Sequence, residues 1–450
     1  MMSQVGYPTY KTTKSPWLGS IPEHWEEKRL KDVATYNDES LDEKTDPDFE
    51  IEYVDISSVS LTHGIEKTEL LAFEKAPSRA RRKVRHGDVI ISTVRTYLKA
   101  IAPIKSPPLN MVVSTGFAVI RPRSSLDARF AGYMLQSNGF VGDVVANSVG
   151  VSYPAINATD LARLPFAEPP LPEQGRISDF LDHKTAQIDA LIAKKQSLLD
   201  KLAEQRSALI SQAVTKGLDP TVPMKDSGVS WLGEVPEHWE TWKVTHGFNR
   251  IGSGTTPKSD NPLFYDGNVP WVTTSELRED TIFDTSQKVT EEAIAQYSAL
   301  KLYPKGSLAI AMYGATIGRL GIFGVDATVN QACCVYSQPT VFDTRFVYYW
   351  LRMRKPILIS LSNGGGQPNL SQDDLKKLWI PIPDICEQRA IAQYLDKKLS
   401  QVEDRIEKVR LVIDKLNEFR SALITNAVTG KIDVRNHMAS VNATHSEAIR

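Results

Sequence analysis

Residues suited to contact a polyanion lie close together between positions 79 and 99. Arginine and lysine side chains pair with phosphate oxygens, and interleaved hydroxyl groups add hydrogen bonds to the same oxygens. Residues 26–74 hold five Lys/Arg against fifteen Asp/Glu, whereas residues 75–129 hold twelve against two. A run of charge can also be no more than a solvated face, and this alternative stays open. The candidate phosphate contacts of the stretch are Arg79, Arg81, Arg82, Lys83, Arg95, Tyr97 and Lys99.

Residue patterns that would carry catalysis are missing from the sequence. Asp260-Asn-Pro-Leu-Phe264 resembles a methyltransferase motif only superficially, and no Gly-x-Gly-x-x-Gly run opens a helix. A motor would need a Gly-x-x-x-x-Gly-Lys loop, and a nuclease would need clustered carboxylates with a lysine. His24 and His238 have no second ligand at a metal-binding spacing, so we interpret both as structural. We therefore expect no catalytic residue, no metal site and no cofactor bound by this chain.

Composition sets the remaining limits. The 450 residues carry a net charge of −1, which neither favours nor excludes a polyanion partner. Three cysteines, Cys333, Cys334 and Cys386, cannot make a disulfide framework and suit a reducing compartment. No apolar stretch approaches the roughly 18 residues that span a membrane, and residues 1–22 lack the apolar core of a secretory signal. We expect a cytoplasmic protein without a membrane partner.

The chain is a tandem duplication. Trp17-Leu-Gly-Ser-Ile-Pro-Glu-His-Trp25 returns as Trp231-Leu-Gly-Glu-Val-Pro-Glu-His-Trp239, with an offset of 214 residues. Glu173-Gln174 and Arg206-Ser-Ala-Leu-Ile210 recur at the same offset, as Glu387-Gln388 and Arg420-Ser-Ala-Leu-Ile424. A period of this length is a domain and not a solenoid repeat. The four tryptophans are interpreted as packing anchors that tie each domain to the helices described next.

The second part of each copy predicts a long helix. Apolar residues recur at seven-residue intervals with charged residues between them, and each series stops near a glycine, Gly217 or Gly430. Burial of each Leu or Ile stabilises by about 1.5–3 kcal/mol, so the two helices are expected to pair as an antiparallel coiled coil. In the second helix, Ile391, Val412 and Phe419 are expected to supply much of the second seam. Ile406 and Ile413 are expected to widen the stripe, and Ile177, Leu191 and Leu198 lie beside the seam residues of the first helix. The predicted seam is Leu181, Ile188, Leu202, Leu209, Leu395, Val402, Val409, Leu416 and Leu423.

The two middles predict one mixed scaffold of short strands, turns and helices. Residues 51–56, 88–93 and 116–120 suit strands in the first copy, as do 270–273, 307–312 and 333–336 in the second. Helical stretches open at Asp127 and Asp343. The fold class is therefore α+β, with two similar mixed α/β domains separated by two long helices that form an antiparallel coiled coil. The expected segments are an N-terminal repeat segment 1–25, a domain 26–171, a spacer helix 172–217, a linker with the second repeat segment 218–239, a domain 240–385, a spacer helix 386–430 and a flexible tail 431–450.

Several motifs of the second copy resemble the specificity subunits of type I restriction–modification enzymes. They are Gly252-Ser-Gly-Thr-Thr-Pro-Lys258, Gly267-Asn-Val-Pro-Trp-Val-Thr-Thr-Ser275, Tyr313-Gly-Ala-Thr-Ile-Gly318, Val329-Asn-Gln331 and Asn363-Gly-Gly-Gly-Gln-Pro-Asn-Leu370. The resemblance covers about residues 15–430. The first copy keeps Gly150-Val-Ser-Tyr-Pro154 but lacks the Gly-rich loop, so its base-reading residues are harder to place.

The resemblance implies that each middle is a target-recognition domain for half of a split site in double-stranded DNA. It also implies two methyltransferase subunits that bring S-adenosylmethionine for adenine methylation. Separate motor–nuclease subunits would use ATP and Mg. A coiled-coil scaffold that reads no DNA is the rival interpretation.

Amide, hydroxyl and basic side chains are the groups that read base edges or hold phosphates. In the first domain, Tyr153 therefore joins the candidates of the basic stretch. In the second domain they select Thr255, Thr256, Lys258, Thr274, Tyr313, Thr316, Arg319, Asn330, Gln331, Asn363 and Gln367.

Overall fold

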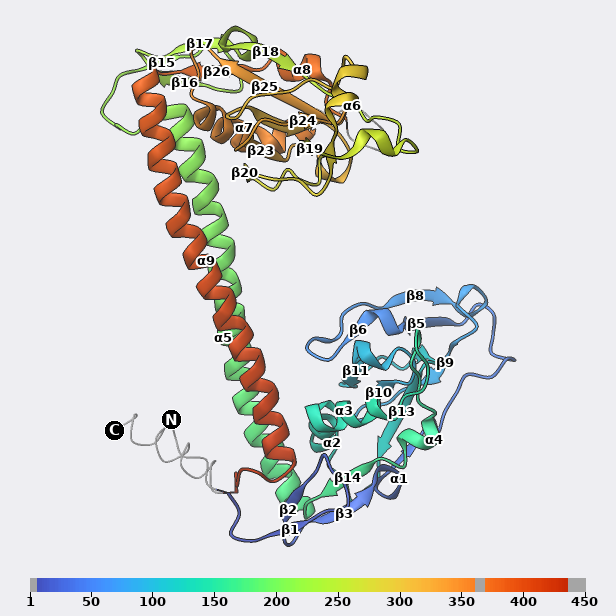
Figure 1. The fold of residues 1–450 in the computed structure, drawn as a ribbon. Coiled ribbons are helices and arrows are strands. Elements are labelled where there is room, and N and C mark those ends of the chain that lie inside the picture. The colour runs from blue at the N-terminus through green and yellow to red at the C-terminus, as the bar shows by residue number, and fades with distance from the viewer. Residues whose placement is uncertain (1–5, 361–368, 436–450) are drawn as a thin grey trace, which may run out of the picture. The chain divides into compact units, whose positions relative to one another are not determined.

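The computed structural model describes residues 6–360 and 369–435, which form two compact units. Unit 1 combines Met1–Lys195 with Arg410–Arg450, and unit 2 is Gln196–Val409. Each unit contains one mixed domain and a segment of each long helix, α5 (Leu171–Lys216) and α9 (Ile385–Val428) (Figure 1). The predicted fold class is confirmed. The units cut across the linear segments expected from the sequence, because the end of α9 belongs to the same unit as the N-terminal domain.

Two antiparallel or mixed sheets of four strands make the body of unit 1. Their orders are β11-β10-β13-β4 and β8-β5-β12-β9, and β5 pairs with β12 in parallel. Three two-stranded pairs, β1-β2, β3-β14 and β6-β7, complete the unit. The strands are β1 Tyr10–Thr12, β2 Ser20–Pro22, β3 Glu26–Arg29, β4 Ala34–Tyr36, β5 Glu50–Val54, β6 Val59–Ser60, β7 Gly64–Ile65, β8 Glu69–Ala72, β9 Ala80–Lys83, β10 Val89–Ser92, β11 Ile101–Pro103, β12 Met111–Ser114, β13 Phe117–Pro122 and β14 Pro165–Glu168. The short helices are α1 Leu30–Val33, α2 Ala128–Gln136, α3 Asn138–Ala146 and α4 Ala158–Leu161.

Unit 2 is built around a five-stranded sheet of order β18-β25-β22-β23-β20 and a smaller sheet β21-β19-β24. Its strands are β15 Met224–Asp226, β16 Glu234–Pro236, β17 Glu240–Lys243, β18 Phe248–Gly252, β19 Tyr265–Val272, β20 Asp280–Ile282, β21 Lys288–Val289, β22 Leu308–Ala311, β23 Leu320–Phe323, β24 Thr328–Val329, β25 Cys333–Pro339 and β26 Trp379–Ile382. The helices are α6 Glu291–Gln296, α7 Thr344–Ser360 and α8 Gln372–Lys376. Every strand predicted from the sequence is confirmed, with ends that shift by a few residues.

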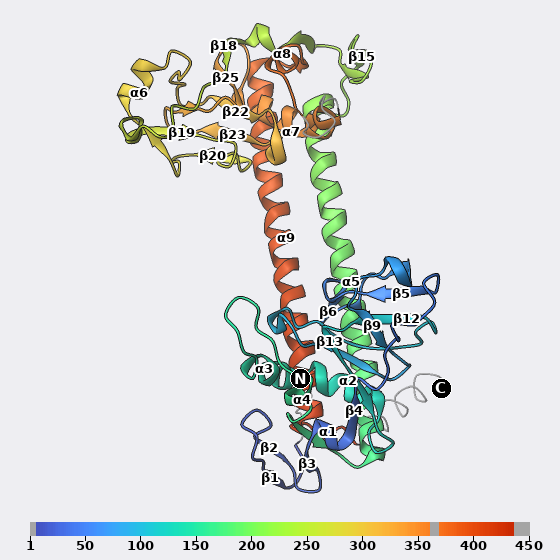
Figure 2. The ribbon, with the colours of Figure 1, turned by 90° about the vertical axis from the view of Figure 1, so that its right-hand side faces the viewer.

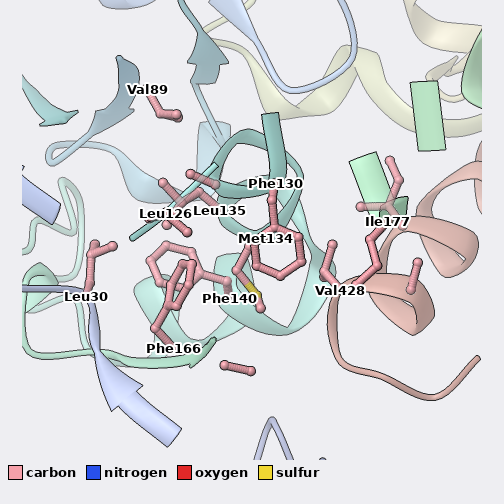
Figure 3. Close-up of a cluster of buried hydrophobic side chains, with 14 of the residues drawn as sticks. Leu30, Val89, Leu126, Phe130, Met134, Leu135, Phe140, Phe166, Ile177 and Val428 are labelled. Carbon is pink, nitrogen blue, oxygen red and sulfur yellow. The ribbon is translucent and has the colours of Figure 1, made fainter. Parts of the chain in front are cut away.

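The largest core cluster of unit 1 joins the domain to both long helices. Phe130 and Met134 of α2, Phe140 of α3 and Phe166 of β14 are fully buried together (Figure 3). Helix α5 contributes residues to the same cluster, and so does the end of α9, which contributes Val428. Helix α3 lies beside that end of α9 (Figure 2), where the backbone amide of Asn138 donates to the Thr425 hydroxyl at 3.1 Å. The domain is therefore packed on the helices and not merely tethered to them.

Within each unit, the segments of α5 and α9 pair antiparallel through the predicted seam. In unit 1, Leu181 and Ile188 share a cluster with Leu423 and Leu416. In unit 2, Leu202 and Leu209 share a cluster with Val402 and Val409, and Leu395 is buried with the end of α5. Two ion pairs cross the seam, Arg420–Asp189 at 2.9 Å in unit 1 and Arg206–Glu403 at 2.9 Å in unit 2.

The apolar stripe is narrower than the sequence predicts. Ile177 and Ile391 are fully buried, but Leu191, Leu198, Val412 and Phe419 are 38–53% exposed. The expectation that Val412 and Phe419 supply part of the seam was wrong, whereas Leu191 and Leu198 were expected only beside the seam residues. A two-helix pair buries only one face of each helix, so residues beside the seam remain in contact with solvent.

The start of the expected flexible tail is packed. Ile432 and Val434 are buried in the core of unit 1, and Lys431 donates to the carbonyl oxygen of Leu18 at 3.3 Å. The expectation of a flexible segment was therefore wrong for residues 431–435. Residues 436–450 lie outside the described part of the chain. Among the described residues, no helix is long and apolar enough to cross a membrane.

Candidate nucleic-acid interface

A repeated Glu-Gln pair at the start of each long helix fixes the domain on the helix. In unit 1, Glu173 accepts hydrogen bonds from the Tyr7 hydroxyl at 2.6 Å and from Trp25 Nε1 at 3.0 Å, and lies 2.8 Å from His24 Nε2. The neighbouring Gln174 is fully buried and accepts from the backbone amide of Asp127 at 2.7 Å. Burial, followed by the hydrogen bond to Glu173, raises the pKa of Tyr7 well above its usual value.

The same anchor recurs in unit 2. Glu387 accepts from Trp239 Nε1 at 3.1 Å and lies 2.9 Å from His238 Nε2. Gln388 accepts from the backbone amide of Asp343 at 2.7 Å. Both aspartates begin domain helices and accept the amide of the third following residue, which is ordinary N-capping. The glutamate therefore binds the repeated Trp segment, and the glutamine binds the first turn of α2 or α7.

The tryptophans are packing residues, as predicted, and two of them, Trp25 and Trp239, donate hydrogen bonds to glutamates of the long helices. Trp25 and Trp239 are fully buried against the glutamates. Trp17 packs edge-on against Phe140 of α3 at 6.2 Å, and Trp231 stacks on the Arg354 guanidinium of α7 at 3.5 Å.

Two of the five cations in the basic run of unit 1 pair with carboxylates of the same unit. Arg79 pairs with Asp55 at 2.7 Å and donates to the Tyr53 hydroxyl at 3.2 Å. Arg85 pairs with Glu39 at 2.6 Å. The hydrogen bond to Tyr53 and the charge of Asp55 raise the pKa of Arg79. The acidic excess of residues 26–74 thus supplies partners for the basic excess that follows it, which lowers the charge available for phosphates.

Strand β9 also divides the other basic residues between its faces. Arg81 is partly buried with its guanidinium 4.4 Å from the Phe73 ring, whereas Lys83 is exposed. Arg82 follows the buried Ala80 on the other face, and burial lowers its pKa. The cluster that the sequence suggests is therefore not one continuous basic surface.

A second group of candidates comes together on two loops that are bonded to each other. The loop 93–99 and the hairpin 147–155 meet at the Val94–Ala155 bridge. Thr96 is buried between them and shares a 2.8 Å hydrogen bond with Ser148. We call these two segments the reading loops of unit 1. Arg95, Tyr97, Lys99 and Tyr153 of the predicted set all lie on them, and all four are exposed.

The reading loops carry backbone strain and unneutralised charge. Arg95 and Lys99 have φ angles of 50° and 54°, which non-glycine residues rarely adopt and which often mark functional sites. The Arg95 guanidinium lies 4.9 Å from the Tyr153 ring. Neither Arg95 nor Lys99 takes part in an ion pair within the described residues. These two side chains are therefore the better candidates for phosphate contacts in unit 1.

In unit 2 the Gly-rich motif forms a loop that is held against the end of β24. A Cβ on Gly254 would lie 1.7 Å from the Val329 carbonyl oxygen, so only glycine permits this approach. Thr256 donates its hydroxyl proton to Gln331 Oε1 at 2.6 Å, and both side chains are exposed. Asn330 accepts the amide of Ala332 and is partly buried. Gln331 is thus presented with its amide orientation fixed by a neighbour.

Other predicted residues of unit 2 surround this loop. The amide of Asn330 donates to the Val272 carbonyl at the end of β19, two residues before Thr274. The backbone amide of Met312 donates a hydrogen bond to the Ala332 carbonyl oxygen, which brings the segment that starts at Tyr313 close to Gln331. The remaining predicted residues are Thr255 and Thr316, partly buried, and Lys258 and Arg319, exposed. Asn363 and Gln367 lie outside the described residues.

Sequence reasoning missed four exposed apolar residues on the reading loops of unit 1. Val149 and Val151 are 81% and 103% exposed, and Val94 and Leu98 are 37% and 49% exposed. The available signal was an apolar run around Gly150 in a stretch without charge. In the described part of the chain, no group of three or more His, Cys, Asp or Glu could hold a metal ion.

Comparison with known proteins decides the family. The profile of the type I restriction modification DNA specificity domain matches residues 22–200 and 236–411. The chain belongs to this family. It carries two copies of the domain and is a specificity subunit of a type I restriction–modification system, as the sequence motifs predicted.

Relatives and solved structures agree over almost the whole specificity subunit. A protein of Methanocaldococcus jannaschii named as the MjaX type I restriction enzyme specificity subunit is 25% identical, over 94% of this chain and 97% of that protein. The HindI specificity subunit of Haemophilus influenzae is 22% identical, over 91% and 99% of the two chains. A chain from a structural study of type I R-M complex assembly aligns with TM-score 0.73 and 23% identity, over 91% and 98%. The HsdS subunit of Thermoanaerobacter tengcongensis aligns with TM-score 0.52 and 22% identity, over 92% and 98%.

Proposed function

We propose that the domain of each unit reads one half of a bipartite DNA site and that the chain itself performs no chemistry. Adenine methylation would be carried out by two methyltransferase subunits that bind S-adenosylmethionine. Cleavage would be carried out by motor–nuclease subunits that use ATP and Mg. This chain would bind none of these cofactors, and it would act in the cytoplasm, where the DNA is.

One observation carries this proposal: the two domains share one anchor but present different loops. Glu173 and Glu387 hold equivalent tryptophans, and Gln174 and Gln388 hold equivalent helix N-termini. The exposed loop groups differ, because unit 1 offers Arg95 with apolar neighbours and unit 2 offers hydroxyl and amide groups. Two domains that recognise different DNA sequences require the same attachment to the helices and different exposed loops.

Exposed apolar residues on the helix pair of unit 1 favour a protein partner. Leu191, Leu411, Val412 and Phe419 of unit 1 are 41–58% exposed on the helix pair. Contiguous exposed apolar residues typically mark protein interfaces. We assign this face to a methyltransferase subunit. Replacing Val412 and Phe419 by Ser should weaken co-purification with the methyltransferase while leaving the seam residue Leu416 untouched.

Selection from random-sequence DNA tests the proposal. The chain assembled with its methyltransferase should enrich two short conserved sequences separated by an unspecified spacer. The isolated chain incubated with DNA and S-adenosylmethionine should transfer no methyl group. A scaffold that reads no DNA would enrich nothing, and methyl transfer by the isolated chain would show that the catalytic assignment is wrong.

A further inference from the structure

The tip of the hairpin 147–155 in unit 1 is made of exposed apolar side chains. Val149 and Val151 flank Gly150 and are 81% and 103% exposed, which means that the tip touches almost nothing else in the unit. Gly150 has a φ of 117°, and a Cβ there would lie 3.1 Å from the Tyr153 carbonyl oxygen. Glycine at this position therefore lets the tip turn tightly and project both valines.

The hairpin is firmly held although its tip is free. The backbones of Val149 and Ala155 exchange two hydrogen bonds of 2.8 and 3.0 Å. Ala155 is also bridged to Val94, and the amide of Ile156 donates to the Thr93 carbonyl at 2.9 Å. Because the tip is already fixed in this way, its binding in a groove loses less conformational entropy than the binding of a flexible loop.

The electrostatic surroundings fit nucleic acid. Residues 89–126 and 144–159, which contain the reading loops, include no Asp or Glu. Arg95 and Lys99 stand beside the hairpin without an ion-pair partner among the described residues. The major groove of B-DNA is about 12 Å wide and admits an α-helix or a two-stranded β-ribbon, so it also has room for a loop that is closed by the single Val149–Ala155 bridge. Phosphates on the groove walls would meet the two cations while the tip meets base edges.

Valine can recognise only one feature of a base edge in that groove. It has no hydrogen-bond donor or acceptor, so it cannot bind the polar atoms of adenine, guanine or cytosine. The 5-methyl group of thymine is the apolar feature that the major groove exposes. We propose that Val149 and Val151 enter the major groove and recognise thymine in the half-site of unit 1 by its methyl group. The inference rests on the proposed DNA-reading function and names the chemical group that the first domain recognises.

The test removes the methyl group from the DNA and the apolar contact from the protein. The full complex with the methyltransferase binds duplexes in which each thymine of the unit 1 half-site is replaced, one at a time, by deoxyuridine. That half-site is the one that survives exchange of residues 240–384. The double variant Val149→Thr/Val151→Thr keeps side-chain shape but replaces one methyl of each valine by a hydroxyl. Leu109→Thr is the matched control, because Leu109 is 106% exposed in the same unit but lies outside both reading loops, between β11 and β12.

We expect wild-type complex to bind about fourfold more weakly for each contacted methyl that is removed, since burial of one such group contributes about 0.8 kcal/mol. The double variant should discriminate between thymine and uracil duplexes less than wild type, because each threonine keeps only one of the two valine methyl groups, and Leu109→Thr should behave as wild type. The proposal is overturned if uracil is tolerated at every position while other base changes still abolish binding. It is also overturned if the double variant keeps the wild-type difference or fails to assemble with the methyltransferase. Failure of the DNA-reading function itself would look different, because the wild-type complex would then show no sequence preference.

Discussion

Removal of the anchoring glutamate should destabilise unit 1 more than unit 2. In unit 1, Glu173→Ala leaves two buried donors without an acceptor, the Tyr7 hydroxyl and Trp25 Nε1. Each buried unsatisfied group costs about 1–3 kcal/mol, so the opening free energy of unit 1 should fall by about 2–6 kcal/mol. In unit 2, Glu387→Ala strands only Trp239, because the side chain of His238 is 50% exposed and can turn to water. The loss there should be about 1–3 kcal/mol.

Native-state hydrogen exchange followed by mass spectrometry measures the two units separately. A double-mutant cycle supplies the control: on a Trp25→Phe background one of the two donors is gone, so Glu173→Ala should cost about 1–3 kcal/mol less. Equal losses in the two units would show that the hydrogen bond from Tyr7 does not add to the stability of unit 1. An undiminished penalty on the Phe background would show that the hydrogen bond to Trp25 is not the source of the effect.

Three further outcomes follow from contacts in the domains. Arg95→Gln with Lys99→Gln should lower the slope of log affinity against log salt by about 0.9 for each lost phosphate contact, whereas Arg79→Gln, whose charge already faces a carboxylate, should change it little; equal effects would contradict this. Gly254→Ala should abolish recognition of the unit 2 half-site in a binding selection, because its Cβ would overlap a carbonyl oxygen, and normal recognition would show that the loop need not be held there. Burial raises the pKa of Glu39, but hydrogen bonds from Arg121 and Arg85 outweigh this effect, so the pKa is lowered overall. The stabilising contribution of Glu39 is therefore complete above the ordinary glutamate pKa, and it is lost as the pH falls through the lowered value. Acid titration of unfolding should therefore be shallower for Glu39→Gln, and an identical curve would exclude this contribution.

The sequence was sufficient for the architecture because the duplication repeats the structural contacts themselves. Trp25 and Trp239, and Glu173 and Glu387, recur at one offset and form one anchor in both units. The heptad spacing likewise predicts which face of each helix is buried. The repetition of Gln174 as Gln388 was visible in the sequence. Its hydrogen bond to the backbone at the N-terminus of α2 could be seen only in the structure.

The charge pattern along the chain does not show which charges are paired in space. The partner of Arg79 is Asp55, which lies in the acidic stretch and is brought near by the β-sheet. The sequence also could not predict that Val412 and Phe419 are exposed, because an apolar residue at helical spacing can face either the paired helix or solvent. The tip at Val151 carries no charge or amide, so a search for polar base readers passed over it.

The central claim is that the two domains read their half-sites independently. Residues 240–384 can be exchanged for the corresponding domain of a relative while the anchors at Glu173 and Glu387 remain in place. Sequencing of methylated DNA from cells that carry the exchanged chain with its partner subunits then gives both half-sites at once. If each unit reads its own half, one half of the methylated site changes and the other is retained. A change in both halves, or in neither, would contradict the claim that each unit reads its own half.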